Sequence, residues 1–198
     1  MVRLFERACI RAGIKAAYSK GYNPRPKLSL PLPKSVGIEV DDDILCIGVE
    51  TDSQDTNDLC TLVTTKLSEQ LPDGINVLTV KAVKGKTSIH PCRATYLIAV
   101  REEYLNDELK NRIESLPASV KLNVQRQTGS ENLRTKTIDV RPFVESIKLN
   151  KTDIEFECKI SPAGSIRVDE ILSLLELDVN KLRGPIRRTK VQWQVSES

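Results

Sequence analysis

Four prolines within ten residues, Pro24, Pro26, Pro31 and Pro33, constrain the fold of this 198-residue chain more than any other feature. Proline fixes φ and has no N–H, so this stretch can form neither a helix interior nor a central strand. Each proline also favours extended backbone in the residue before it. We therefore predict a stiff, extended ribbon over residues 17–39, in which residues 28–33 (LSLPLP) form an edge or irregular strand.

The ribbon (residues 17–39) is basic and carries two tyrosines. Its single acid is Glu39. Arginine and lysine neutralise phosphates, and tyrosine rings stack on unpaired bases, so one interpretation is RNA binding. The other is an edge strand whose cations prevent edge-to-edge pairing, and composition leaves the two even. The predicted RNA contacts are Tyr18, Lys20, Tyr22, Arg25 and Lys27, and the residues predicted to hold the ribbon's shape are Gly21, Asn23, Pro24, Pro26 and Gly37.

Charge is uneven along the chain, although the net charge is only +3. Residues 1–34 hold eight Lys/Arg and one acid, whereas residues 35–73 hold ten Asp/Glu and one lysine. Clustered cations favour a polyanionic partner, and the acidic stretch is typical of a solvated opposite face. Two smaller basic groups extend the predicted patch if the fold brings them together: a helical stripe of Arg3, Arg7 and Arg11, and Arg187 and Arg188 near the C-terminus. A solvated helix face is the more usual explanation of the stripe.

The first half, residues 1–88, predicts the order helix, strand, strand, helix, strand. The first helix covers residues 2–12 and ends at Gly13. Residues 44–51 predict a strand, a second helix starts at Asp55 or Thr56 and runs through Gln70, and residues 75–83 (INVLTVKAV) predict a strand. The second helix should bury a stripe of Leu59, Leu62, Val63 and Leu67. This order is that of a ferredoxin-like βαββαβ unit without its first strand.

The second half, residues 89–198, predicts a similar α+β order after a linker at residues 84–93. Strands are expected at residues 94–100, 121–126, 133–150 and 153–160, with a polar loop at residues 128–132 and a closing strand at residues 185–195. Helices are expected at residues 106–116 and after Ser165, which would cap the second of them. We therefore predict an α+β protein with two ferredoxin-like halves side by side. Trp193 is more typical of core or rim than of an RNA contact.

The residue inventory argues against catalysis by this chain alone. Five cysteines without a CxxC pair, and one histidine, His90, predict reduced thiols and no metal site. No nucleotide-binding or nucleophile–base motif is present. Asp41–Asp43 has the character of a turn, and Glu39 is more typical of a strand edge than of a general acid or base. No apolar run is long enough to span a bilayer, so we expect no membrane partner and a cytoplasmic location.

Residues 5–39 resemble a known family, the radical SAM-linked proteins that carry the DUF2344 domain. The Tyr-Ser-x-Gly-Tyr-Asn-Pro segment at residues 18–24 is the specific part, and residues 71–78 and 186–191 also fit. The matching positions are Arg7, Ala8, Arg11, Ala12, Gly13, Tyr18, Ser19, Gly21, Asn23, Pro24, Pro26, Ser29, Pro31, Leu32, Pro33, Gly37 and Glu39. Family members usually have a strand and a Ser-His-Leu-Asp stretch before the first helix, so we expect an N-terminally short version. Arg25 stands where the family usually has histidine.

The resemblance implies a radical SAM protein as partner. This chain has no CxxxCxxC, so S-adenosylmethionine and the iron–sulfur cluster are expected on that partner, with no cofactor in this chain. The predicted function is a non-catalytic RNA-binding or substrate-presenting accessory domain, in RNA modification or a ribosome-linked process. The alternative is a module that docks onto the partner without contacting nucleic acid. The missing first strand would expose a sheet edge, which predicts self-association.

Overall fold

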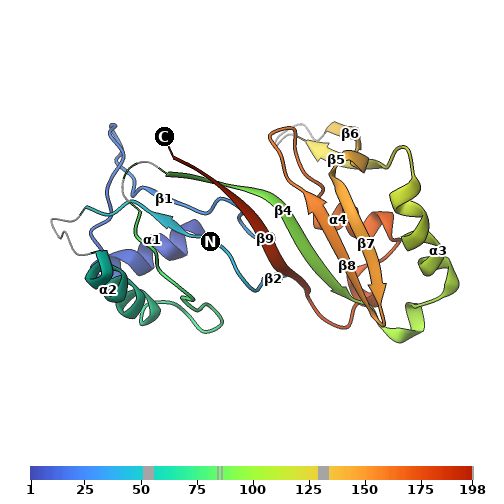
Figure 1. Cartoon of the computed structure of the whole chain (residues 1–198), viewed down its shortest axis with the longest axis horizontal. Helices are drawn as coiled ribbons and strands as arrows, with labels where there is room; N and C mark the ends of the chain where they lie inside the picture. The colour runs from blue at the N-terminus through green and yellow to red at the C-terminus, as the bar shows by residue number, and fades with distance from the viewer. Residues whose placement is uncertain (51–55, 84, 86, 129–133, 198) are drawn as a thin grey trace. The chain divides into compact units, whose positions relative to one another are not determined.

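The structure is a computed structural model that describes residues 1–50, 56–83, 85, 87–128 and 134–197. It is an α+β protein, as predicted, and the chain divides into two compact units (Figure 1). Unit 1 comprises residues 1–33, 44–89 and the chain from Val195, and unit 2 comprises residues 34–43 and 90–194. The predicted domains, 1–88 and 89–198, are continuous, whereas the units interleave along the chain.

The described residues of unit 1 form two helices and a two-stranded sheet. Helix α1 spans Val2–Arg11 and α2 spans Thr56–Ser68. The strands β1 (Leu28–Ser29) and β3 (Cys46–Ile47) pair antiparallel. Gly13 ends α1 as predicted: it adopts a left-handed φ of 66°, and the N–H groups of Gly13 and Ile14 bond to the carbonyls of Ile10 and Cys9. This is a Schellman motif, which a residue with a Cβ would strain.

The core of unit 1 forms where the two helices meet. Ala8 and Cys9 of α1 and Leu67 of α2 are buried together. Six partly buried side chains pack on them: Ile14, Leu28, Leu45, Ile47, Leu71 and Val77. This core is small, and Leu62 of the stripe predicted for the second helix lies exposed on α2. Leu62 therefore corrects the predicted buried stripe.

Residues 75–83 are not a strand, contrary to the prediction. Their sequence has the β-branched, alternating character of a strand, but the segment belongs to none of the sheets formed by the described residues. A strand needs a partner for its backbone groups, and sequence pattern alone cannot supply one. The predicted strand at residues 44–51 is also shorter than expected, since β3 holds two residues and Val49 adds one isolated bridge.

Unit 2 is organised by a five-stranded mixed sheet in the order β2-β9-β4-β8-β7. Its strands are β2 (Ile38–Val40), β4 (Thr87–Ala99), β7 (Val144–Asn150), β8 (Asp153–Lys159) and β9 (Ile186–Glu197). β2 runs parallel to β9, while β4 and β7 run antiparallel to β8. A separate hairpin pairs β5 (Asn123–Thr128) with β6 (Arg134–Asp139).

Helix α3 (Asp107–Ser115) contacts β7, and helix α4 (Val168–Leu174) contacts β5. Short 3₁₀ turns occupy Glu102–Tyr104, Leu116–Ala118, Arg141–Phe143 and Val179–Lys181. Alternate residues of β4 and β8 are buried on one face of the sheet, among them Ile98, Ile154 and Phe156. The residues between them, such as Thr95 and Glu157, remain partly exposed on the other face. This alternation is the one that the sequence of β8 predicts.

Three predictions for the second half need correction or lie outside the described residues. The linker predicted at residues 84–93 is largely strand, because β4 starts at Thr87 and includes His90 and Pro91. α4 is capped by Arg167 rather than Ser165, and the Arg167 N–H bonds to the Glu170 carboxylate at 2.8 Å. Most of the polar loop predicted at residues 128–132 lies outside the described residues. Two ferredoxin-like halves are not confirmed, since unit 1 has no four-stranded sheet among its described residues.

Candidate nucleic-acid interface

The basic ribbon does not run extended over residues 17–39, as predicted, but folds back on itself over residues 16–29, named here the 16–29 hairpin. Tyr18 and Pro26 form an antiparallel bridge between its two legs. The Lys27 N–H donates to the Ala17 carbonyl at 2.7 Å, and the Ser19 N–H donates to the Arg25 carbonyl at 2.8 Å. The Arg25 N–H also donates to the Ser19 hydroxyl at 3.0 Å. In Figure 1 the hairpin is the blue loop that rises above β1.

Gly48 fixes the base of the 16–29 hairpin, and sequence reasoning did not single it out. Its carbonyl accepts from the Ala17 N–H at 2.7 Å, and its N–H donates to the Lys27 carbonyl at 2.8 Å. A Cβ at this position would lie 3.1 Å from the Lys27 Cβ, so the two hairpin legs approach the backbone of Gly48 closely. Glycine inside a predicted strand often marks such an approach, which was the available signal.

The five predicted contact residues of the ribbon all lie exposed on this hairpin: Tyr18, Lys20, Tyr22, Arg25 and Lys27. Tyr22 is fully exposed at the tip, where no neighbouring side chain covers its ring. Lys20, Arg25 and Lys27 form no ion pair within the described part of the chain. The hairpin therefore presents uncompensated positive charge beside two accessible aromatic rings.

The residues predicted to hold the ribbon's shape contribute unequally. Pro26 is half-buried at the bridge, while Asn23 and Pro24 are exposed at the tip. Gly37 has a left-handed φ of 80° in the turn before β2, which favours glycine there. Gly21 has no such φ, and a Cβ at Gly21 would meet nothing within 4 Å, so the geometry does not require glycine at that position.

The helical arginine stripe lies in the same unit as the hairpin. Arg3 and Arg7 are exposed on α1 without an ion pair among the described residues. Arg11 has a structural contact instead: its guanidinium donates to the side-chain and backbone oxygens of Gln70, at 3.1 and 2.8 Å. Arg11 thus ties the end of α1 to the residues that follow α2.

Arg187 and Arg188 belong to unit 2 and are already paired there. Arg187 is bidentate to Asp41, with both distances 2.9 Å. Asp41 and its neighbour Glu39 hold the pKa of Arg187 above its usual range. Arg188 is buried and donates to Asp43 at 2.7 Å. Both aspartates follow β2, so the acidic 41–43 turn clamps this edge strand to β9, and Arg188 is not part of an exposed phosphate-binding surface.

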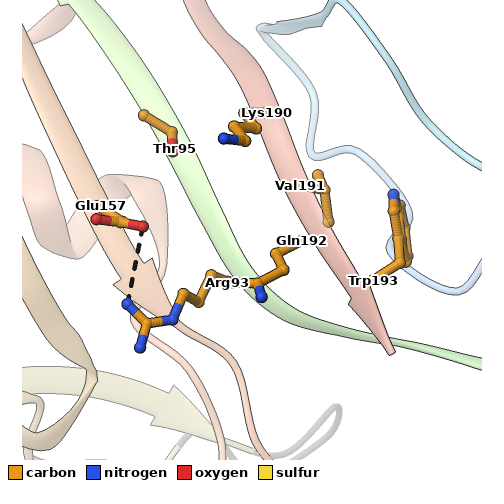
Figure 2. A pocket seen from close by; sticks show the side chains of 7 residues that line it. All are labelled: Arg93, Thr95, Glu157, Lys190, Val191, Gln192 and Trp193. Carbon is orange, nitrogen blue, oxygen red and sulfur yellow. Dashed lines mark ion pairs between the residues drawn. The ribbon is translucent and has the colours of Figure 1, made fainter. Parts of the chain in front are cut away.

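A second candidate is an open depression of about 530 Å³ on the sheet of unit 2 (Figure 2). It is lined by Arg93, Thr95, Glu157, Lys190, Val191, Gln192 and Trp193. Arg93 lies 3.2 Å from Glu145 and 3.9 Å from Glu157, so its charge is balanced. Trp193 is half-buried, in keeping with a rim position. Of the two cations that line the depression, Lys190 alone forms no ion pair with a described residue. The 16–29 hairpin carries three such cations, so it suits a polyanion better than the depression does.

The potential metal ligands, Glu39 and the cysteines can be placed in the described part of the chain. No group of three metal-ligating side chains occurs in this part of the chain, and Glu39 is exposed on β2 opposite Arg187. All five cysteines are free thiols, with Cys9 and Cys158 buried. Burial raises the pKa of Cys158 to about 12 and also raises that of its neighbour Tyr96.

Within the described residues, no helix is long and apolar enough to cross a membrane.

The model of one protein family, DUF2344, described as an uncharacterized protein conserved in bacteria, matches residues 1–170. The chain belongs to the DUF2344 family. The match includes the whole 16–29 hairpin and ends within α4. Neither a curated protein nor a solved structure matches this DUF2344 chain. The predicted link to a radical SAM protein is not part of this match and stays a prediction.

Proposed function

We propose that this chain is a non-catalytic RNA-binding accessory module whose 16–29 hairpin contacts the RNA. The observation that carries the proposal is the set of three exposed, unpaired cations, Lys20, Arg25 and Lys27, on one hairpin with Tyr18 and Tyr22. Cations contribute a salt-dependent attraction to phosphates, and exposed tyrosines offer stacking platforms for bases. Arg3 and Arg7 on α1 would add to the positive field of unit 1.

The rigidity of the hairpin supports the same proposal. Its legs are joined by backbone hydrogen bonds to each other and to Gly48, and its prolines restrict φ. A surface that is ordered before binding loses less conformational entropy when the ligand arrives. The exposed cations can therefore bind RNA without a change in the conformation of the hairpin.

The proposal also includes a radical SAM enzyme as partner and a ferredoxin-like second half. The family resemblance supports a radical SAM enzyme as the protein that acts on the bound RNA, with S-adenosylmethionine and the iron–sulfur cluster on that enzyme. The ferredoxin-like interpretation of the second half is supported by the order β9-β4-β8-β7, with α3 between β4 and β7 and α4 between β8 and β9. Many unrelated functions share that architecture, so the site carries the functional argument.

A second candidate function is docking onto the partner enzyme without nucleic acid. The exposed ring of Tyr22 beside Pro24 favours it, since aromatic and proline side chains also form preformed protein-binding surfaces. Salt separates the two functions. Phosphate binding weakens steeply as salt rises, because bound counterions are released, whereas apolar docking weakens less.

The test is binding of a fluorescent mixed-sequence RNA across a salt series. The wild type should bind with a steep negative slope of log affinity against log salt, and the Arg25→Ala/Lys27→Ala variant should bind more weakly with a slope shallower by about two. A matched control is Lys121→Ala/Lys148→Ala, which removes two exposed, unpaired lysines of unit 2.

Equal losses in both double variants would mean that net charge, and not the hairpin, governs binding. Absence of binding by the wild type at low salt would overturn RNA binding by this chain. A pull-down with the radical SAM protein, repeated with Tyr22→Ala, would then test the docking function directly.

A further inference from the structure

Residues 75–83 of unit 1 have the sequence of a strand but pair with no strand among the described residues. The Ile75 N–H bonds to the Pro72 carbonyl at 3.2 Å. From Asn76 to Val83, no backbone or side-chain group forms a hydrogen bond with a described residue. Figure 1 shows the segment as coil between α2 and β4. An unpaired run of this length is a ready template for strand addition.

Some side chains of this segment pack against the core of unit 1, and others are exposed to solvent. Val77 packs on the core cluster of Ala8, Cys9 and Leu67. Leu78 and Val83 are 65% and 67% exposed, although both are large and apolar. Exposed β-prone apolar segments are rare on monomers and mark interaction sites. The segment is therefore anchored to unit 1 by one set of side chains while its backbone remains available.

We propose that residues 75–81 pair antiparallel with the same residues of a second copy, with Leu78 on the two-fold axis of a symmetric dimer. An isologous interface must be complementary to itself, and the charges of this segment meet that condition. Asp73 and Lys81 are both exposed, and neither forms an ion pair with a described residue. Antiparallel pairing about Leu78 sets Lys81 opposite Ile75 of the second copy and diagonal to its Asp73.

The same charges disfavour a parallel, in-register arrangement of two copies. A parallel, in-register pair would align Lys81 with Lys81 and Asp73 with Asp73, and like charges directly opposite are destabilising. In the antiparallel pair, Leu78 meets its own copy at the axis, so the exposed apolar side chain becomes covered. This inference does not depend on RNA binding, because the 16–29 hairpin contributes no residue to it.

Sedimentation velocity of the full chain over a wide concentration range tests the proposal. The wild type should change from monomer to dimer as concentration rises. Leu78→Lys places two lysines opposite each other at the axis and should raise the dimer dissociation constant by about tenfold or more. Val120→Lys is the matched control, since Val120 is an exposed valine of unit 2, and it should leave the constant unchanged.

A cross-linking variant gives a positive readout. Under mild oxidation, Leu78→Cys should form a covalent dimer much faster than Val120→Cys, with the wild type as background for the native thiols. A wild type that remains monomeric at every concentration would overturn the proposal. Unchanged dimerisation in Leu78→Lys, or equal cross-linking of the two cysteine variants, would overturn it as well. RNA binding is measured separately, so its outcome leaves this result unaffected.

Discussion

The guanidinium of Arg188 donates a 2.7 Å hydrogen bond to the carboxylate of Asp43, and only 3% of the arginine side chain is exposed. The two residues are 145 positions apart in the chain. One position earlier on β9, Arg187 pairs with Asp41 at the surface. Adjacent arginines on one strand thus form two ion pairs with aspartates of one turn, and the pairs differ chiefly in burial.

This difference predicts unequal consequences for two similar substitutions. Asp43→Asn leaves a buried guanidinium without its countercharge and should lower the free energy of unfolding by about 3 kcal/mol. Asp41→Asn should leave stability unchanged within error, because surface ion pairs contribute little. Urea unfolding of both variants, followed by circular dichroism, measures the two changes. Equal effects would contradict a structural role specific to the buried pair.

The ion pair between Arg126 and Glu170 makes stability depend on pH. Glu170 is 4% exposed, and both of its carboxylate oxygens lie 2.6 Å from Arg126 nitrogens, which joins β5 to α4. Burial opposes ionisation of Glu170, but the hydrogen bonds from Arg126 and from the Arg167 N–H lower its pKa below the usual value. The carboxylate therefore stabilises the fold above the unfolded-state pKa of about 4.3, and this contribution is lost as pH falls through the lowered pKa.

Glu170→Gln should accordingly destabilise unit 2 by about 3 kcal/mol at neutral pH. The penalty should shrink as pH is lowered below about 4, because the wild type then loses the same charge. Glu108→Gln, at an exposed site on α3, is the control. Urea unfolding at neutral and acidic pH gives the comparison, and a penalty independent of pH would contradict the role of the ionised pair.

Local signals were sufficient for several elements. The spacing of apolar residues and Gly13 predicted α1 and its end, and the alternation of Ile154 and Phe156 predicted β8 and its buried face. Tyr22, which the basic and proline-rich composition marked as an accessible contact residue, is exposed, although the hairpin that presents it was not predicted. These predictions depend on neighbours in sequence, which a single chain reveals.

Predictions that depend on distant residues were less successful. Strand alternation could not show that Arg188 faces inward, because its burial depends on the strands and helices around β9 and its charge is balanced by Asp43. Residues 75–83 have strand propensity, but the sequence does not show whether another strand lies beside them. In the structure they belong to no sheet. The role of Gly48 likewise depends on Ala17 and Lys27, which reach it through a fold-back of the chain.

The buried thiol of Cys158 should be chemically inert in the folded protein. Burial raises its pKa to about 12, so the reactive thiolate is scarce at pH 8, and the side chain is also inaccessible. Iodoacetamide labelling followed by mass spectrometry should modify Cys60, which is half-buried, before Cys158. Both should react alike in denaturant. Equal rates in the native protein would contradict the burial of Cys158 on β8.

The 16–29 hairpin can be loosened without removing any of its charges. Gly48→Ala places a Cβ 3.1 Å from the Lys27 Cβ and 3.6 Å from the Ala17 Cβ, and this crowding should cost about 1 kcal/mol. The Ala17 and Lys27 amides should then exchange with solvent about fivefold faster, which NMR hydrogen exchange measures. RNA affinity should fall while its salt slope stays the same, since the cations remain.

Gly21→Ala is the matched control, because its Cβ would enter open space in the same hairpin. It should change neither amide exchange at the hairpin base nor RNA affinity. If Gly48→Ala speeds exchange and leaves affinity unchanged, the ordered hairpin is not needed for binding and the cations act as a diffuse field. If both properties change together, the backbone bonds at Gly48 position Lys27 and Arg25 for the phosphates.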